Sequence, residues 1–263
     1  MSGSRIATYS CTALVGTNKT GELKPDESGY YTLMVGAVDS YNSAGCYYPA
    51  GPAKELFDES SAFQRRIRDG ALYGELGHPR KAPSMSMRDF MGRCMDIQET
   101  NICCHFRKIW LAAPQRGPDG RTIVPIMAEV KPTGAMGHAL REGLENRHQN
   151  VCFSIRSFTQ DVMQNGVVNK LLRQIVTFDY VVEPGIAIAR KWHAPGLESF
   201  EEQTILPPML EDYIRTQRAA GMGMESSVRM ASETLDALNW TPRYAAERRS
   251  SNRPASAVFV DKQ

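Results

Sequence analysis

Residues 71–79, ALYGELGHP, place a histidine directly before a proline, at the end of a segment punctuated by glycines. The ring of Pro79 disfavours helical geometry at the preceding residue, so we expect His78 on extended backbone with few conformational options. A histidine held in this way could be a surface residue of a turn. It could also be a general base, because an imidazole titrates near neutral pH and needs a fixed orientation to act.

A serine that could act as a nucleophile lies in residues 150–158, NVCFSIRSF, which predict a strand. Ser154 has apolar neighbours on both sides, and Arg156 projects to the same strand face because side chains alternate along a strand. A hydroxyl beside a cation suits acyl transfer, in which a nucleophile attacks and a positive charge stabilises the oxyanion. The alternative is an ordinary serine on the polar side of a strand.

Such a serine needs a base, and the base needs a group that orients it. Of the five histidines, His78 is the one presented by a constrained turn, whereas His105 lies within an apolar strand and is the second choice. Asp179 is a charge embedded in the apolar stretch IVTFDYVVEP, and buried carboxylates are rare unless they are paired. Asp179 therefore fits the orienting role, unless it faces solvent at a sheet edge.

The six cysteines leave a second kind of nucleophile open. Cys103, Cys104 or Cys152 could serve a thiol enzyme, and Cys152 shares the face of Ser154 by strand alternation. The sequence has no CxxC pair, and the group Cys103, Cys104 and His105 lacks the second ligand pair that zinc sites usually need. We therefore predict no metal and no other cofactor.

The composition is that of a globular protein, with 263 residues, 42% hydrophobic and 23% charged. The 31 basic and 29 acidic residues nearly cancel, so we expect no nucleic-acid-binding surface. The N-terminal stretch MSGSRIATYS has no apolar segment, and no run approaches the roughly 18 apolar residues of a membrane-spanning helix. Neither secretion nor membrane association is predicted.

Strand patterns dominate the first two thirds of the chain. Apolar, β-branched and aromatic residues predict strands at 5–16, 30–38, 100–113, 122–132, 150–158 and 169–184. Helical spacing predicts one helix over 52–70 and further helices at 86–97, 137–146, 208–221 and 225–238. Residues 241–263 are polar, basic and interrupted by proline, and we expect them to be disordered.

The order of several motifs resembles the prohead maturation proteases of tailed bacteriophages, which are distant relatives of the herpesvirus assemblins. The first motif is a loop with four marker residues: Asn42, Gly45, Tyr47 and Pro49. The glycine-glutamate-leucine-x-histidine-proline motif of residues 74–79 follows, and it is the most specific of the set. Next come a strand ending in CCH at His105, the strand of Ser154 and Arg156, and the strand of Asp179.

The resemblance implies that His78 is the base and Ser154 the nucleophile. It leaves the third catalytic member open between Asp179, ranked first, and His105, ranked second. Arg156, together with backbone amides, would then stabilise the oxyanion. The predicted fold class is α+β: a mostly antiparallel, β-barrel-like core flanked by helices, with a helical or disordered C-terminal tail.

The sequence departs from the family pattern at two positions. Cys152 stands where glycine is usual, and Ile155 stands where a second serine is common. The second departure leaves Ser154 as the one serine there in the nucleophile's place. A catalytically inactive structural capsid or tail component with the same fold is the alternative, and the intact His78 and Ser154 argue against it.

Members of this family act inside an immature capsid on capsid, scaffold and internal head proteins. The resemblance therefore implies a serine endopeptidase located in the procapsid and virion, assembled in the host cytoplasm. Its partners would be those viral proteins as substrates, and a homo-oligomer stays open. Members tend to cleave after glutamate, and Arg107, Lys108 and Arg190 are candidates for a cationic pocket that would bind the glutamate side chain.

The C-terminal part of the chain itself contains the expected cleavage pattern, a glutamate with a small or aliphatic residue two positions before it. Five such tripeptides lie beyond the predicted core, and they end at Glu198, Glu201, Glu225, Glu233 and Glu247. We therefore expect a zymogen with a protease core at 1–195 and a C-terminal segment at 196–263 that the enzyme removes by self-cleavage.

Overall fold

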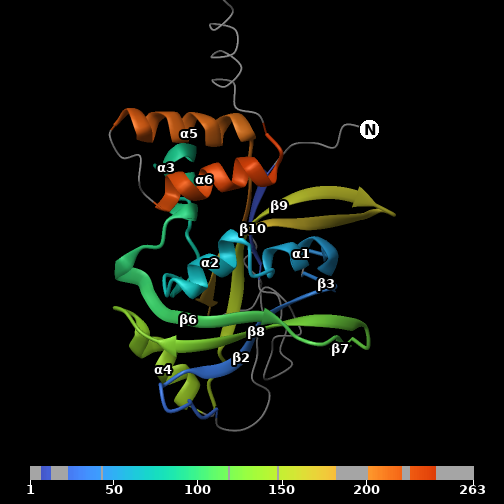
Figure 1. Ribbon diagram of the computed structural model, residues 1–263, viewed down its shortest axis with the longest axis vertical. Helices are drawn as coiled ribbons and strands as arrows, with labels where there is room; N and C mark the ends of the chain where they lie inside the picture. The colour runs from blue at the N-terminus through green and yellow to red at the C-terminus, as the bar shows by residue number, and fades with distance from the viewer. Residues whose placement is uncertain are drawn as a thin grey trace, which may run out of the picture.

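The computed structural model of the protein describes residues 7–12, 23–42, 44–117, 119–146, 148–181, 201–220 and 226–240. These residues form two β-sheets with helices packed around them (Figure 1). Side chains are described for all of these residues except 7–12 and 201–204.

The first sheet has six strands in the order β11-β1-β9-β10-β4-β3. Their bounds are β1 (Ala7–Thr12), β3 (Ser40–Tyr41), β4 (Tyr47–Tyr48), β9 (Cys152–Gln164), β10 (Val167–Val181) and β11 (Glu201–Ile205). All pairs are antiparallel except β4 with β10. The long β9 and β10 are joined by Asn165 and Gly166, both at positive φ, which is the Asn-Gly turn that favours two-residue hairpins.

The second sheet has the order β2-β8-β6-β5, and β7 pairs with β8 off this path. Its strands are β2 (Tyr31–Val38), β5 (Tyr73–Glu75), β6 (Ile102–Leu111), β7 (Gln115–Arg116) and β8 (Thr122–Pro132). Much of the main hydrophobic core comes from both sheets, including Val35, Phe106 and Ile126 from the second and Phe153 and Phe178 from the first.

The predicted single helix over 52–70 is wrong, because two helices occupy this range: α1 (Ala50–Leu56) and α2 (Ala62–Arg68). Ser61 separates them, since its hydroxyl donates to the carbonyl of Leu56 and accepts the N–H of Gln64. Serine side chains compete with the helical backbone in this way and favour helix starts. The remaining helices are α3 (Met87–Met95), α4 (Gly137–Glu145), α5 (Pro207–Ala219) and α6 (Ser226–Ala237), with a 3-10 turn at Glu99–Asn101.

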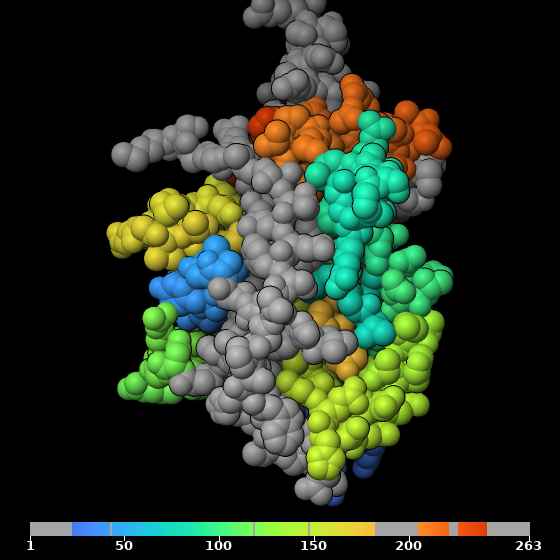
Figure 2. Space-filling view, turned by 180° about the vertical axis from the view of Figure 1, so that it is seen from behind, coloured from blue at the N-terminus to red at the C-terminus, as the bar shows by residue number. Residues whose placement is uncertain are grey.

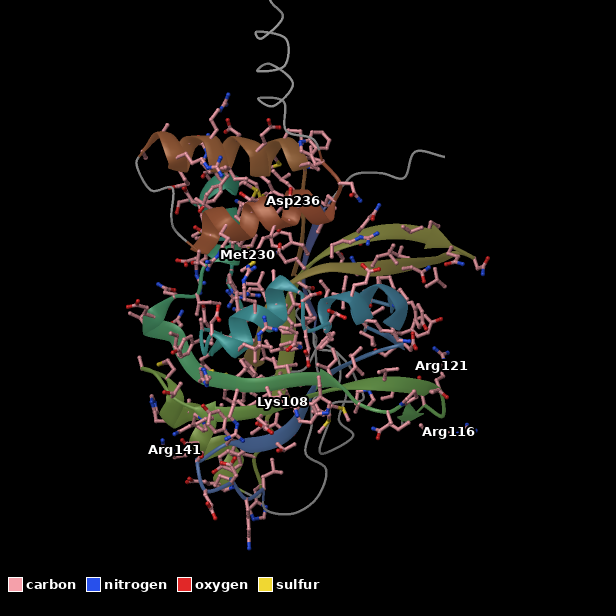
Figure 3. All side chains as sticks on the ribbon, in the orientation of Figure 1. Lys108, Arg116, Arg121, Arg141, Met230 and Asp236 are labelled. Carbon is pink, nitrogen blue, oxygen red and sulfur yellow. The ribbon has the colours of Figure 1, made fainter. Side chains whose placement is uncertain are left out.

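Helices α3, α5 and α6 form a layer at one end of the molecule (Figure 1). They enclose a second hydrophobic cluster with Phe158 of β9 and Val176 of β10. Met230 of α6, which Figure 3 labels, is buried in this cluster. The described part of the segment that we predicted as a separable tail, 201–220 and 226–240, is therefore packed on the sheet, and β11 pairs with β1.

Strand β9 is buried on both faces from Cys152 to Thr159, and β10 lies between β9 and β4. Beyond Gln160 the β9–β10 hairpin leaves the body, and its tip projects from the molecule when viewed from behind (Figure 2). The buried half of this hairpin is the part that carries the residues singled out from the sequence.

The predicted α+β class with mostly antiparallel sheets is confirmed. Among the described residues the sheets do not close into a barrel. They meet instead where residues after β5 reach β10: Leu76 forms a bridge with Tyr180, and Gly77 N–H donates to the Tyr180 carbonyl. The expected disorder of 241–263 and the expected end of a strand at Pro184 lie outside the described residues.

Candidate active site

The histidine motif runs along β10 where the two sheets meet. Residue 74 must be glycine there, because a Cβ on Gly74 would lie 2.3 Å from the carbonyl oxygen of Phe178. Gly77 has a φ of +78°, which residues with side chains rarely adopt, and its N–H donates to Tyr180 at 2.8 Å. The two glycines bring the backbone against β10 and direct His78 toward that strand.

His78 and Asp179 form a hydrogen-bonded pair, with 2.9 Å between Nδ1 and Oδ2. The Asp179 side chain is fully buried, which excludes the alternative of a solvent-facing position at a sheet edge. The His78 side chain is 17% exposed. When Nδ1 donates its proton to a carboxylate, Nε2 is the basic nitrogen of the ring, as in the Ser-His-Asp hydrolases.

Ser154 lies directly across the β9–β10 ladder from Asp179. The side chains of opposed residues project to the same face, with Cβ atoms about 4.5–5.5 Å apart. Ser154 is 1% exposed, so it is not a serine on a solvent-facing side. Within the described part of the chain its Oγ has no hydrogen-bond partner, although buried hydroxyls normally have one. A hydroxyl in this state, next to a His-Asp pair, is a candidate nucleophile.

Arg156, which shares this face, is fully buried and binds Asp179 in a bidentate manner. Its Nε donates to Oδ2 at 2.9 Å and its Nη2 to Oδ1 at 2.8 Å, while Nη1 donates to the Asp96 carbonyl at 3.1 Å. A bidentate arginine fixes the plane of a carboxylate as well as neutralising its charge. We expected this guanidinium to face an oxyanion, and in the structure these N–H groups point to Asp179 and to the backbone.

The surroundings of Asp179 favour its charged form. Burial alone would raise the pKa of this carboxyl, but the charge of Arg156 and the hydrogen bond from His78 hold the pKa below its usual range. Asp179 is therefore ionised at neutral pH. An ionised carboxylate at this position can fix the His78 tautomer and stabilise the imidazolium that forms when the ring accepts a proton.

Two charged residues that the sequence analysis did not select extend this group. Glu75 is fully buried, lies 3.4 Å from Arg156, and accepts hydrogen bonds from both terminal nitrogens of Arg93. The N–H of Glu75 also donates to Asp179 at 3.1 Å. The one signal in the sequence was a carboxylate in a short apolar stretch between two glycines, because such a charge needs buried partners.

His105, the second choice for the third catalytic residue, lies in a different environment. Its Nδ1 is 2.9 Å from the hydroxyl of Tyr30, and its Nε2 is 3.1 Å from the carbonyl of Gly70. Its ring also makes an edge contact with Tyr73. None of these partners belongs to the group around Asp179.

The buried thiols are poor candidates for nucleophiles. Burial raises the pKa of Cys152 to about 12, and burial is also the main reason why the pKa of Cys104 lies well above its usual range. Because the thiolate is the reactive form, both groups are unreactive near neutral pH.

The cations considered for a glutamate pocket are differently placed. Arg107 forms ion pairs with Asp26 and Glu129, each at 2.6 Å. Lys108, labelled in Figure 3, lies over the ring of Trp110 with its Nζ 5.0 Å from the centroid. Arg190 lies outside the described residues.

Two of the five tail glutamates lie in regular structure. Glu201 begins β11, and Glu233 lies in α6, where it forms a 2.9 Å ion pair with Arg65. Glu198, Glu225 and Glu247 lie outside the described residues. Within the described part of the chain, no helix is long and apolar enough to cross a membrane, and no cluster of three His, Cys, Asp or Glu side chains could hold a metal ion.

The chain is of the peptidase class, because residues 9–237 match the Peptidase S80 family. The chain is 33% identical over 235 residues to the capsid maturation protease of Pseudomonas phage phiKZ, and the match covers 86% of each chain. The chain therefore belongs to the Peptidase S80 family, and its resemblance to the phage prohead proteases is confirmed.

A solved structure, that of the bacteriophage T4 capsid assembly protease gp21, is also similar. The TM-score is 0.42 at 12% sequence identity, and the similarity covers 66% of this chain and 98% of the T4 chain.

Proposed function

We propose that this peptidase is a serine endopeptidase of phage head maturation, with Ser154 as nucleophile, His78 as general base and Asp179 as the residue that orients His78. The observation that carries the proposal is the 2.9 Å bond from His78 Nδ1 to Asp179, together with the position of Ser154 directly across the ladder from Asp179. Its buried Oγ, without a partner in the described residues, supports the same assignment.

In this mechanism Ser154 Oγ attacks the scissile carbonyl carbon while its proton passes to Nε2 of His78. The tetrahedral intermediate then expels the amine, which takes the proton from His78, and an acyl-enzyme remains. Water attacks the acyl-enzyme with His78 again as base and releases Ser154. Asp179 stays ionised throughout, Arg156 holds its carboxylate plane, and backbone amides stabilise the oxyanion.

The proposed substrates are capsid, scaffold and internal head proteins inside the procapsid, cleaved after glutamate. The kinship with a capsid maturation protease supports this choice. We also propose that the enzyme is a zymogen that cuts its own C-terminal region after one or more glutamates. The 1% exposure of Ser154 supports an activation step, since a nucleophile must contact its substrate.

The test is the intact mass of the purified chain beside that of the Ser154→Ala variant, followed by assays of both on a peptide with one glutamate. We expect the normal chain to lose C-terminal mass at a glutamate and to cleave the peptide, while Ser154→Ala stays at full length and is inactive. His78→Ala should behave like Ser154→Ala.

Trimming and peptide cleavage that are equal in the normal chain and the Ser154→Ala variant would remove Ser154 from the mechanism. An absence of peptide cleavage by the normal chain, with or without capsid and scaffold proteins, would favour an inactive structural relative. A second peptide with glutamine in place of glutamate tests the specificity separately, because it keeps the shape and removes the charge.

A further inference from the structure

Asp179 of the catalytic pair belongs to a network of four buried or half-buried charged side chains. Asp179 is bound by Arg156, Arg156 lies 3.4 Å from Glu75, and Glu75 is bound by Arg93 of α3. The side chains of Asp179, Arg156 and Glu75 are fully buried, while that of Arg93 is 20% exposed. Two cations alternate with two anions, so the charges of these four side chains sum to zero.

Hydrogen bonds to the backbone fix the geometry of this charged network. Glu75 Oε1 accepts the N–H of Gln98 at 2.7 Å, and the N–H of Glu75 donates to Asp179. The carbonyl of Asp96 accepts from both guanidinium groups, at 3.2 Å from Arg93 and 3.1 Å from Arg156. The two arginines thus converge on one carbonyl and one carboxylate, which holds them side by side.

This convergence bears on the catalytic pair through Arg156. The positive charge of the bound guanidinium partly neutralises the negative charge of Asp179, so Asp179 stabilises a protonated His78 less strongly. The negative charge of Glu75 partly neutralises the Arg156 guanidinium, and the positive charge of Arg93 partly neutralises Glu75. In a buried site of low dielectric constant, the charges of Glu75 and Arg93 are less screened than in water, so they influence Asp179 and His78 through Arg156.

We propose that Glu75 and Arg93 are positioning residues of the active site, which act through Arg156 to fix the Asp179 carboxylate and to set the charge that His78 meets when it accepts a proton. This inference rests on the proposed function. It gives a role to Glu75, the glutamate of the histidine motif, whose side chain binds Arg93 and Arg156 rather than His78 or Ser154.

A thiol and a second carboxyl group also belong to the surroundings of this network. Burial is the main cause of the raised pKa of the Cys104 thiol in β6, followed by Cys103 and then the charge of Asp179, so Cys104 is neutral near pH 7. The Asp96 side chain lies 3.4 Å from the hydroxyl of Ser226. The charged groups of the network that reaches His78 are Asp179, Arg156, Glu75 and Arg93. Arg80 and Lys81 also carry charge two and three positions after His78, and Arg80 is exposed.

The test is the pH dependence of kcat/KM on a glutamate peptide for Glu75→Gln, Arg93→Gln and the double variant. Glu75→Gln removes a negative charge, so protonated His78 becomes less stable and the acid limb should move to lower pH by about one unit. Arg93→Gln removes a positive charge and should move the acid limb to higher pH. The double variant restores the charge balance and should return the limb toward its normal position.

Arg88→Gln is the matched control. Arg88 lies on the same helix as Arg93 but forms its ion pair with Asp212 at the surface, so its loss should leave the acid limb unmoved. Lower kcat in both single variants with an unmoved acid limb would overturn the proposal and leave the network a purely structural role. If Glu75→Gln does not fold, Arg93→Gln alone still decides, since Arg93 reaches the surface.

The failure of this inference is distinguishable from failure of the proposed function. An active Ser154→Ala variant would refute the serine mechanism whatever the pH profiles show. An inactive Ser154→Ala variant combined with unmoved acid limbs would refute only the roles of Glu75 and Arg93.

Discussion

Asp179 is held from two sides, by His78 at 2.9 Å and by Arg156 through both carboxylate oxygens. The same carboxylate thus orients the base and closes a buried ion pair. Two different losses should follow when it changes, one in the rate of catalysis and one in stability.

Asp179→Asn tests this double role. An amide keeps the shape but cannot hold the His78 tautomer, and we expect kcat to fall about 10⁴-fold, as in other Ser-His-Asp enzymes. It also leaves Arg156 buried without its bidentate partner, which costs about 3–5 kcal/mol in comparable buried pairs. Activity assays and thermal unfolding measure the two effects. Ser154→Ala is the control, because it should abolish activity with little change in Tm.

The same carboxylate makes stability depend on pH at the acid end. The pKa of Asp179 is below its usual range in the folded protein, while an unfolded chain has a value of about 3.9. Its contribution to the free energy of unfolding is therefore present above about pH 4 and is lost as pH falls through the folded pKa. Urea unfolding between pH 6 and pH 3 should show a smaller loss for Asp179→Asn than for the normal chain. Equal losses would contradict this linkage.

Gly74→Ala tests the close approach of the histidine motif to β10. An alanine Cβ would lie 2.3 Å from the backbone carbonyl of Phe178, which cannot turn away as a flexible side chain could. We expect a loss of about 1–3 kcal/mol in stability and a large loss of activity, because the segment carrying His78 must move. Gly51→Ala in α1, where nothing lies within 4 Å, should leave both nearly unchanged. Normal activity of Gly74→Ala would show that His78 does not depend on this contact.

The candidate nucleophiles can be separated with a thiol reagent. The pKa of Cys152 is raised to about 12 by burial, so N-ethylmaleimide at pH 7 should leave peptide cleavage intact. Cys152→Ala should remain active, with reduced stability from the cavity it creates. Inactivation of the normal chain by the reagent, together with loss of peptide cleavage in a folded Cys152→Ala variant, would instead assign the chemistry to the thiol.

Parts of the site could be predicted from the sequence because local rules governed them. Pro79 restricts the backbone at His78, Gly77 permits a positive φ just before it, and Asp179 is a lone charge in an apolar strand. Glu75 and Arg93 could not be paired from the sequence, since 18 positions separate them. Their contact depends on where α3 lies, and this is set by the packing of its buried face against α5 and α6, which are distant in the sequence.

For the fold as well, features set by local sequence rules could be predicted, and features that depend on competing or long-range contacts could not. Periodicity and turn signals predicted most strands, but the break at Ser61 within the 52–70 helix depended on hydroxyl bonds that compete with the helical backbone. The tripeptides that end in glutamate predicted a C-terminal segment at 196–263 that is removed by self-cleavage. The apolar faces of α5 and α6 indicate in addition that both helices pack against other elements, because such faces must be buried.

The position of self-cleavage should therefore decide whether activity survives. A chain ending at Glu198 lacks β11, α5 and α6, which would expose Phe158, Val176 and the α3 face that carries Phe90. It would also remove the cluster partners of α3, including Tyr213 of α5, and α3 is the helix that positions Arg93 against Glu75. We expect this chain to lose both its cooperative unfolding transition and its peptide cleavage.

A chain ending at Glu247 retains every described residue, and we expect it to keep the Tm of the full chain and to cleave the peptide. Ser154→Ala versions of both truncated chains separate folding from activity, because they cannot trim themselves further under the proposed mechanism. A cooperatively folded and active chain ending at Glu198 would show that α5 and α6 are dispensable and that the tail is separable from residue 196 onward. The opposite result would mean that a cut after Glu198 ends the activity of the enzyme, whereas a cut after Glu247 leaves it active.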